Sequence, residues 1–547
     1  MKADAKPWWF WALLAFTILL LVPIWYFHYL PLNDWPNHLA GVHMVLENDA
    51  GRPSYLQANP NLLLPNSTGF WFMRVLGPFV GVETSGRLLL CITIILSIWG
   101  AAYFMRQIHP DIEPLGGALG AALAYNWFFL MGFLNYALSI PLFLIAAGYW
   151  MKPAKDRDGK AFAGAVLLSL LATLTHIVAG AVLVAVIGVM RLIEAGQAAW
   201  NDSGAKSGLG RPSKSGLGHL FKNIRWDLAF ALPVLAIALL SLGPILAPEQ
   251  GGRMVWGSPW QELNYLLHIP PNPALSIIFL VIVATDILLW MRSEKNGWMP
   301  AARWLAVAIL LAAGAMLLPE STASWQFAAP RLWPFFIFAL AAAVFRPMAE
   351  RGAKQLITEL AIAMLIFTAV EMGVMMVGWV AEQPRLEAIA SVADYLQPAA
   401  AGQLSGPRIA VLPIGEGFAM TGEQGTVSPY FHAWGYWVVQ KGVYAPYVFA
   451  EQYSPVQFKD GRAHGRTELN AAIGDLAYKV FARPTAEKCR HWKEYYQAIN
   501  WTRISEEYDY VVLRVGACEN ASIVPAPFEQ KLTNGPLYIF ENRNRKK

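Results

Sequence analysis

Long apolar stretches with almost no charge dominate the sequence, and they restrict the possible folds more than any other feature. A helix needs roughly 20 apolar residues to cross the hydrocarbon core of a bilayer, and such runs recur along residues 1–380. The chain of 547 residues is 56% hydrophobic and only 14% charged, against roughly 25% charged in an average soluble domain. The pattern excludes a disordered chain and predicts a polytopic α-helical membrane protein.

We expect about eleven spans, and the basic residues orient them. With the N-terminus in the cytoplasm, nineteen Lys and Arg of residues 1–380 face the cytoplasm and five face the other side, as the positive-inside rule requires. The first span has no cleavage site of small residues, so it is not a removable signal peptide. The spans are expected at 8–27, 85–105, 114–132, 135–151, 161–177, 178–191, 227–246, 274–291, 302–318, 332–346 and 356–379.

Charge density divides the chain into two expected domains. Residues 381–547 carry 35 charged side chains in 167 positions, whereas residues 1–380 carry only 44. The first part is therefore expected to be a transmembrane domain with a long outside loop at 28–84. The second part is expected to be a water-soluble domain, which an odd number of spans places outside. The expected boundary lies near Glu382.

The outside domain combines short helical and strand patterns, which predict a small α/β fold. Cys489 and Cys518 both lie in it, on the oxidising side, where a disulfide or two free thiols are both compatible with the sequence. The strand-like runs are 408–413, 510–515 and 537–540, and the helical stretches are 384–397, 466–482 and 486–498.

The outside loop begins with the string Asp34-Trp-Pro-Asn37-His38-Leu-Ala. One interpretation makes Asp34 an N-cap, with Pro36 in the first turn of a helix that runs to about Leu46. On such a helix His38 lies four positions after Asp34, so the two side chains can share a face. The other interpretation makes Asp34 a general base that takes a proton from a hydroxyl at the membrane surface. Residues 68–80 are expected to form an interfacial helix beside it.

This arrangement resembles the GT-C superfamily of integral-membrane glycosyltransferases. The first span, the early outward Asp, the interfacial helices and the outside α/β domain follow that architecture, and residues 34–40 are similar to the Asp-x-Pro-Asn-His-Leu-Ala/Ser string of a branch of uncharacterised bacterial members. The resemblance implies sugar transfer from a polyprenyl-phosphate donor, with Asp34 as the inverting base and Asn37 and His38 in the binding site. Two further short strings, which end at His176 and at Arg331, also resemble members of this superfamily.

Neutralisation of the donor phosphate requires a cation, because negative charge builds on the oxygen that leaves the sugar. Outside the membrane the candidates are Arg253 and Arg331, and an interfacial anchor is the alternative for Arg331. His38 and His176 are candidates for hydrogen bonds to phosphate or sugar. The histidines show no metal-ligand spacing, and Asn33 and Asn135 stand where many GT-C enzymes have a second acid, so a divalent metal is not supported. The outside acids that could add a ligand are Glu47, Asp49, Glu83, Glu249, Glu262 and Glu320.

The sequence therefore predicts a glycosyltransferase of the bacterial inner membrane, with its C-terminal domain in the periplasm. Its expected partners are a lipid-linked sugar donor, membrane lipid and a glycan, lipid or protein acceptor. The net charge of +5 shows no basic stripe, which excludes a nucleic-acid binder. A transporter or flippase is the alternative, with Asp286 and Glu371 as its acids at membrane depth, and a non-catalytic assembly or sensor protein is a third possibility.

Overall fold

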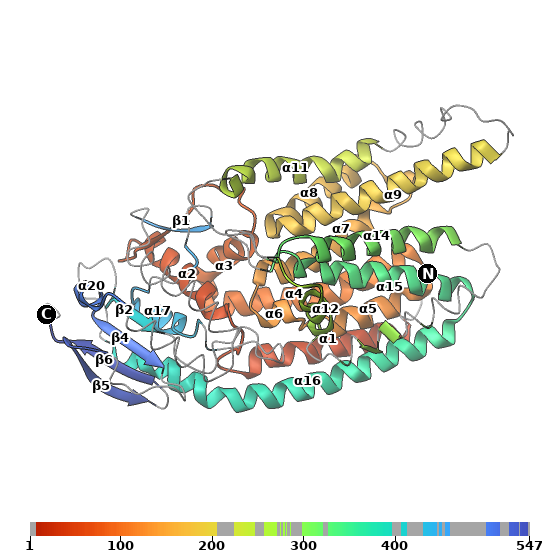
Figure 1. Ribbon diagram of the computed structural model, residues 1–547. Coiled ribbons are helices and arrows are strands. Elements are labelled where there is room, and N and C mark those ends of the chain that lie inside the picture. Colours follow the sequence, from red (N-terminus) through yellow and green to blue (C-terminus); the bar gives the residue numbers. More distant parts are fainter. Residues whose placement is uncertain are drawn as a thin grey trace.

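The computed structural model is a long bundle of helices with a small sheet at one end (Figure 1). The structure describes residues 7–204, 224–246, 256–270, 274, 277–278, 280–281, 285, 298–320, 327–396, 406–412, 430, 432–445, 448–450, 454–459, 499–514, 524–534 and 537–544. The bundle helices are α1 (Trp8–Tyr26), α4 (Val82–Ile108), α5 (Glu113–Ala122), α6 (Trp127–Leu130), α7 (Leu134–Trp150), α8 (Gly159–Thr175), α9 (Ile177–Gly204), α11 (Ile224–Leu246), α14 (Trp298–Leu317), α15 (Trp333–Glu350) and α16 (Lys354–Ala390). Short 3₁₀ helices are η1 (Pro110–Ile112), η2 (Ala154–Asp156), η4 (Pro330–Leu332) and η5 (Ser391–Tyr395).

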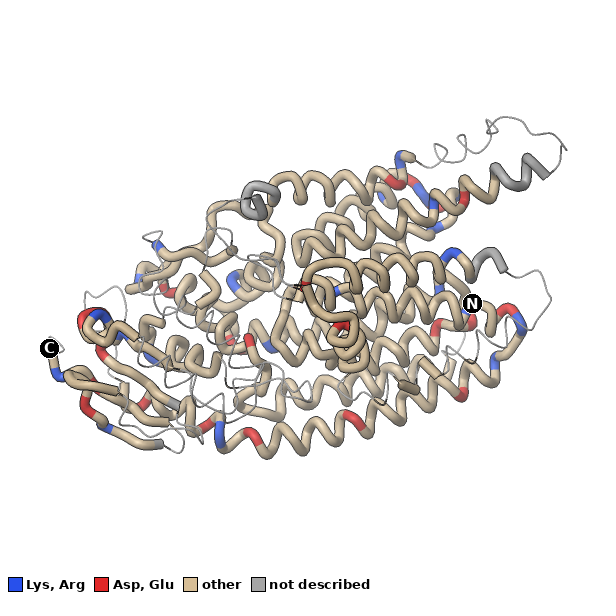
Figure 2. Tube along the Cα trace, viewed as in Figure 1, with Lys and Arg blue, Asp and Glu red and all other residues tan. Residues whose placement is uncertain are grey.

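Six helical segments of the described residues are long and apolar enough to cross a membrane, namely Trp8–Tyr26, Val82–Ile108, Ile177–Ala198, Ile224–Ser241, Pro330–Glu350 and Lys354–Tyr395. Three shorter apolar helices accompany them, Leu134–Trp150, Gly159–Thr175 and Ala302–Leu317. Figure 2 shows charged residues gathered toward the two ends of the bundle and sparse along its middle. On α16, Ile366, Val370 and Val377 are 60–72% exposed, an arrangement that suits lipid rather than water. The chain is therefore a membrane protein.

Two expected features of the spans differ in the structure. The stretch 114–132 is not one helix, because α5 ends at Ala122 and the single turn α6 follows; there the Asn126 side chain accepts from the amides of Phe128 and Phe129. The last span does not end at the expected boundary, since α16 continues through Pro384 to Ala390. Most of the expected span at 274–291 lies outside the described residues. The count of eleven spans and the division into 1–380 and 381–547 stay predictions.

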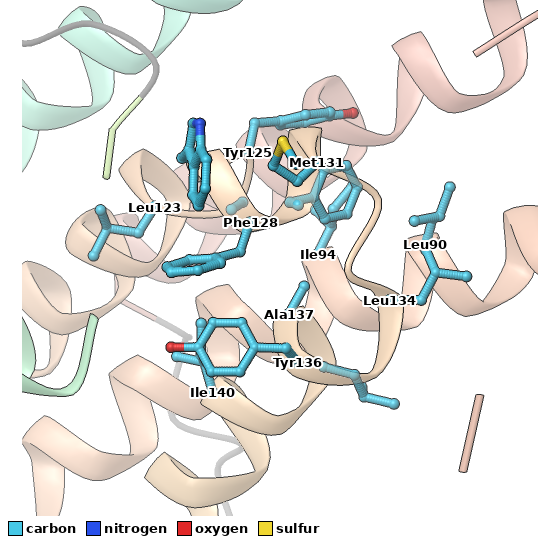
Figure 3. Packing of buried hydrophobic residues seen from close by; sticks show 14 of the residues in the cluster. Leu90, Ile94, Leu123, Tyr125, Phe128, Met131, Leu134, Tyr136, Ala137 and Ile140 are labelled. Carbon is cyan, nitrogen blue, oxygen red and sulfur yellow. The ribbon is translucent and has the colours of Figure 1, made fainter. Parts of the chain in front are cut away.

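Aromatic and aliphatic side chains fill the centre of the bundle, where α4 packs along both α5 and α7. Figure 3 shows Phe128, Met131 and Tyr136 of this core close to Ile94 on α4. The rings of Phe128 and Tyr136 meet edge to face, with centroids 4.5 Å apart, a favoured geometry for aromatic pairs. This core fixes the turn between α6 and α7.

Short helices and strands cover the end of the bundle at which the sheet lies (Figure 1). The helices there are α2 (Trp35–Asp49), α3 (Thr68–Val80), α17 (Gly435–Lys441) and α20 (Trp501–Glu507). Helix α12 (Pro259–His268) instead contacts α14 and η4 of the bundle. The strands are β1 (Leu56–Ala58), β2 (Ile409–Leu412), β3 (Val456–Phe458), β4 (Tyr510–Arg514), β5 (Phe528–Asn534) and β6 (Leu537–Asn542). The expected helices at 35–46 and 68–80 and all three expected strands are present.

The four-stranded sheet has the order β2-β4-β6-β5, with β2 parallel to β4 and the other pairs antiparallel. The expected helix at 384–397 is the end of α16 together with η5. The expected helices at 466–482 and 486–498, with Cys489 and Cys518, lie outside the described residues.

The C-terminal part packs directly on the loop between α1 and α4. Strand β3 pairs antiparallel with β1, so that Leu56 lies opposite Phe458. The hydroxyl of Tyr55 donates to Val443 O at 3.2 Å, and Trp437 Nε1 donates to Ile389 O at 2.7 Å. These contacts bring the segment around α17 onto the start of α2, where Asp34 lies.

Candidate functional site

Asp34 lies at the junction of α2 with the turn between α6 and α7. The amide of Asn33 donates to Leu130 O at 3.2 Å, and the amide of Asp34 donates to Met131 O at 3.0 Å. Gly132 has φ +75°, and a Cβ there would lie 2.8 Å from Asp34 N. Only glycine meets both requirements. The backbone around Asp34 is therefore fixed by a part of the chain about 100 residues further on.

The carboxylate of Asp34 does not cap α2. The residue occupies the N-cap position, but its backbone is already helical (φ −90°, ψ −6°) and its side chain makes no capping hydrogen bond. The capping interpretation is therefore wrong. Instead Asn33 Nδ2 donates to Asp34 Oδ1 at 2.7 Å, and Asp34 is only 7% exposed.

Burial raises the pKa of Asp34 to about 8, because a desolvated carboxylate resists ionisation. The hydrogen bond from Asn33 and the positive charge of Arg331 act in the opposite direction. A carboxyl group with this pKa exchanges its proton near neutral pH, which is the property required of a general base. The electrostatics also place Arg331 near Asp34.

His432, from the segment before α17, is the functional candidate that sequence reasoning missed. Its Nε2 lies 3.4 Å from Asp34 Oδ1, and its Nδ1 lies 3.1 Å from Asn37 Nδ2. Asn37 Oδ1 accepts a hydrogen bond from the amide of Phe449 at 3.0 Å. Because Asn37 and His432 are 395 positions apart, no spacing pattern could have paired them.

His38 lies beside this group but bonds elsewhere. Its ring hydrogen-bonds the backbone of Gly132 and packs edge-on against Phe449, with centroids 5.6 Å apart. Burial lowers the pKa of His38 to about 4 and that of His432 to about 3. A positive charge on His38 would lower the pKa of His432 further. Both imidazoles are neutral at pH 7, so Arg331 is the fixed positive charge that acts on Asp34.

Arg331 lies in η4, between two aromatic rings. Its guanidinium carbon is 5.4 Å from the Phe133 ring centroid and 5.5 Å from that of Tyr136. The Tyr136 hydroxyl donates to Arg331 O. Arg331 Nε is buried and has no hydrogen-bond partner among the described residues. Stacked and with an unused donor, this guanidinium differs from an interfacial anchor that extends into water.

His176 reaches the same cluster from the junction of α8 and α9. Its ring packs edge-on against Tyr136, with centroids 5.0 Å apart, and its Nδ1 accepts from the amide of Val178 at 3.2 Å. Nε2 is thus the nitrogen that carries a proton. The structure therefore gathers five of the six residues expected in the site, Asp34, Asn37, His38, His176 and Arg331. Arg253 lies outside the described residues.

Asn135, the residue that stands where a second acid was considered, has a structural role. Its Oδ1 accepts from the amide of Gly69 at 2.7 Å, and its Nδ2 donates to Asn66 O at 2.7 Å. The side chain thereby ties α3 to the start of α7. In the part of the chain that the structure describes, no three or more His, Cys, Asp and Glu side chains form a metal-ligand group.

A pair of buried carboxylates, Glu262 and Glu320, lies where α12 meets the segment before η4. Gln261 Nε2 and the Tyr265 hydroxyl each donate to Glu320 Oε1 at 2.8 Å. Neither oxygen of Glu262, which is 2% exposed, accepts a hydrogen bond within the described residues. A Cβ on Gly257 would lie 2.6 Å from Glu262 Oε1 and 3.6 Å from Glu320 Oε2, so the two acids face one point. Burial, followed by the charge of Glu320, raises the pKa of Glu262 to about 7.

Two solved structures resemble the chain over nearly its whole length. They are crystal structures of ArnT from Cupriavidus metallidurans, one bound to undecaprenyl phosphate and one in the apo state. The first is 11% identical with a TM-score of 0.54 and 99% of both chains covered, and the second is 12% identical with a TM-score of 0.51 and 98% covered. The apo oligosaccharyltransferase from Archaeoglobus fulgidus is 10% identical, with a TM-score of 0.43, 94% of this chain covered and 70% of that chain. No family model and no curated protein matches the sequence.

The likeness to ArnT shows that this chain shares the fold of those two structures. The GT-C superfamily, the bacterial branch and its motif stay predictions. At 11–12% identity the likeness shows the fold alone, and function has to be argued from the site.

Proposed function

We propose that the protein transfers a sugar from a polyprenyl-phosphate donor to a hydroxyl acceptor, and that Asp34 is the general base. The observation that supports this most directly is a buried carboxylate of raised pKa beside Arg331, a stacked guanidinium with an unused donor. The similar fold of ArnT, solved with undecaprenyl phosphate, supports the class of donor.

The reaction follows from the charges at the two ends of the site. The acceptor oxygen attacks the anomeric carbon of the sugar, and its proton passes to Asp34 as the new glycosidic bond forms. The bond between the anomeric carbon and the phosphate oxygen breaks from the opposite face, so the configuration inverts. The leaving lipid phosphate gains negative charge on that oxygen, and Arg331 stabilises it through paired N–H donors.

The remaining candidates fill supporting roles in the proposal. His176 carries its proton on Nε2 and packs against Tyr136, and in the proposal this N–H donates to the phosphate or to a sugar hydroxyl. His38 is held by Gly132 as a neutral ring beside Asp34. Arg253 stays a proposed second phosphate ligand. In this proposal the site opens on the periplasmic face of a bacterial inner membrane, with the N-terminus in the cytoplasm.

The test is a deletion strain whose envelope glycans and lipids are compared with the parent by mass spectrometry. One sugar modification is expected to disappear and to return with the wild-type gene. Asp34→Asn is expected not to restore it, because an amide cannot accept the proton, and loss of a general base lowers rates by about 10²–10⁴.

Asp49→Asn is the matched control. Asp49 lies at the end of α2 in an exposed pair with Arg74, at 2.7 Å, so its variant is expected to restore the modification. Equal glycan profiles in the parent and the deletion strain, or full restoration by Asp34→Asn at equal membrane abundance, would contradict the proposed function.

A further inference from the structure

A chain of three polar contacts leads from the backbone of Phe449 to the carboxylate of Asp34. The Phe449 amide donates to Asn37 Oδ1 at 3.0 Å, and Asn37 Nδ2 lies 3.1 Å from His432 Nδ1. His432 Nε2 then lies 3.4 Å from Asp34 Oδ1. Asn37 is 1% exposed and His432 is 6% exposed, so the two middle residues of this chain are buried.

The backbone end of this chain decides which ring nitrogen of His432 carries the proton. An amide N–H can only donate, so the Asn37 atom that meets Phe449 is the oxygen and the atom that meets His432 is the nitrogen. Asn37 Nδ2 has only donors, which makes His432 Nδ1 an acceptor without a proton. A neutral imidazole with a bare Nδ1 carries its proton on Nε2, and that nitrogen faces Asp34 Oδ1.

We propose that His432 is a positioning residue for Asp34, held by Asn37 in the tautomer that presents Nε2–H to Oδ1 and leaves Oδ2 to take the acceptor proton. The inference deepens the proposed function and rests on it for the identity of the base. Asn33 Nδ2 donates to the same Oδ1 at 2.7 Å, so two N–H groups favour the ionised carboxylate through one oxygen.

The other groups that face Asp34 do not replace this donor. Arg331 lowers the pKa of Asp34 by its charge and is the group assigned to the donor phosphate. His38 is directed to the backbone of Gly132. His432 is neutral because burial, with a smaller effect from His38, lowers its pKa to about 3. The imidazole therefore acts on Asp34 as a hydrogen-bond donor and not as a cation.

Two substitutions of His432 separate the donor from the side chain that carries it. In His432→Gln the amide nitrogen can reach the place of Nε2 and donate to Asp34. In His432→Asn the shorter side chain reaches only the place of Nδ1. The two variants have the same amide group, so a loss caused only by damaged packing would affect them in the same sense.

The direct measurement is the protonation of Asp34 in the full-length protein in lipid nanodiscs. The infrared carbonyl band of the protonated carboxyl group is followed against pH and is assigned by its loss in Asp34→Asn. His432→Asn is expected to raise the midpoint by about one pH unit, a tenfold change in proton affinity, whereas His432→Gln is expected to stay within a few tenths of the wild type. An unchanged midpoint in His432→Asn would overturn the inference.

The tautomer is measured separately by ¹⁵N NMR of protein labelled at histidine, with the His432 signals assigned by their loss in His432→Gln. A bare Nδ1 and a protonated Nε2 are expected. Asn37→Asp is expected to reverse the tautomer, because a carboxylate at position 37 accepts a proton from Nδ1 and leaves Nε2 bare. A protonated Nδ1 in the wild type would overturn the inference.

Sugar transfer completes the test. At pH 7 His432→Asn is expected to lose about tenfold in kcat with KM unchanged, and to recover as the pH is raised, since the base is then ionised again. His432→Gln is expected to keep most of the rate. If the wild type transfers no lipid-linked sugar while the Asp34 midpoint still moves as expected, the proposed function fails and the positioning of Asp34 by His432 stands. If transfer occurs and His432→Asn keeps the wild-type pH profile, the positioning role fails alone.

Discussion

Asp34 and the pair Glu262–Glu320 are buried carboxylates whose neighbours differ in kind. Asp34 is surrounded by nitrogen atoms, from Asn33 at 2.7 Å and His432 at 3.4 Å, with the charge of Arg331 nearby. Glu262 has the second acid, Glu320, as its nearest charge. Burial raises both pKa values, to about 8 and about 7. A side chain favours ionisation in each case, Asn33 for Asp34 and Trp333 for Glu262, but the neighbouring charge is positive for Asp34 and negative for Glu262. Raised pKa alone therefore does not identify a base, and the neighbours decide which acid can perform chemistry.

Among the neighbours of the two buried acids, replacement of Arg331 is expected to have the largest effect. Arg331→Ala should lower sugar transfer by about 10²–10³, because the leaving phosphate loses its preorganised donor. Arg331→Lys should lose less, about tenfold, since it keeps the charge and loses the planar pair of donors. Steady-state transfer measured in nanodiscs checks this.

Arg346→Ala is the control for Arg331, because Arg346 pairs with Glu350 at 2.8 Å on the part-exposed surface of α15. It should leave transfer unchanged. Equal rates for Arg331→Ala and the wild type would remove Arg331 from the site.

The next largest effect is expected in the pH dependence of sugar transfer, which should depend on Asp34 and not on Glu262. A base works in its ionised form, so kcat/KM should rise about tenfold per pH unit below the pKa of Asp34, near pH 8, and then level off. Glu262→Gln should leave this profile in place. A profile that falls as pH rises from 6 to 8, or one that moves with Glu262→Gln, would reverse the roles of the two carboxylates.

The pair Glu262–Glu320 is expected to affect the pH dependence of stability rather than sugar transfer. The folded-state pKa of Glu262 is raised to about 7 from 4.5, so the folded protein binds this proton more tightly than the unfolded chain does. Its contribution to stability is complete below pH 4.5 and is lost as the pH rises to 7.

Glu262→Gln should therefore increase the free energy of unfolding at pH 8.5 by on the order of 1 kcal/mol and so raise the midpoint temperature of thermal denaturation. At pH 4.5 it should give no gain. Thermal scans of wild type and variant at the two pH values measure this. A gain of equal size at both values would show that ionisation of the buried Glu262 is not the cause.

The smallest effect is expected at an exposed acid with an ideal partner. Arg52 donates to both oxygens of Glu47, at 2.5 and 2.6 Å, and lowers its pKa. Because water screens this pair, Glu47→Gln should change stability by no more than about 0.5 kcal/mol. A larger loss in the same thermal scans would show that hydrogen-bond geometry outweighs burial in this protein.

Local sequence patterns predicted the elements around the site well. The string that begins at Trp35 carries a proline in its first turn, and α2 begins there. The alternation and turn residues around 409–412, 510–514 and 537–542 gave three strands of the sheet. Each of these signals lies within one element, where hydrophobic period and backbone restriction act over a few residues.

Errors arose where tertiary contacts override local preference. The apolar stretch 114–132 looked continuous, but Asn126 caps α6 and Trp127 N donates to Ile269 O at 2.8 Å, so the helix breaks. Helix α16 continues through Pro384 while Gln383 bonds the backbone of Tyr29 at 2.8 and 3.2 Å, and the domain boundary expected near Glu382 stays a prediction. Asp is a common N-cap residue, but the carboxylate of Asp34 accepts a hydrogen bond from the Asn33 side chain instead of from an amide of α2.

The sequence by itself determined that this is a membrane protein, because the hydrophobic effect acts on every long apolar run wherever it lies in the chain. It also determined which acid precedes α2, since that follows from residue order alone. Only the tertiary structure decided that this acid meets His432, which the chain brings back from 395 positions beyond Asn37, and that Glu262 instead meets Glu320. A pKa depends on distance in space and on excluded water, and neither quantity is contained in the order of the residues.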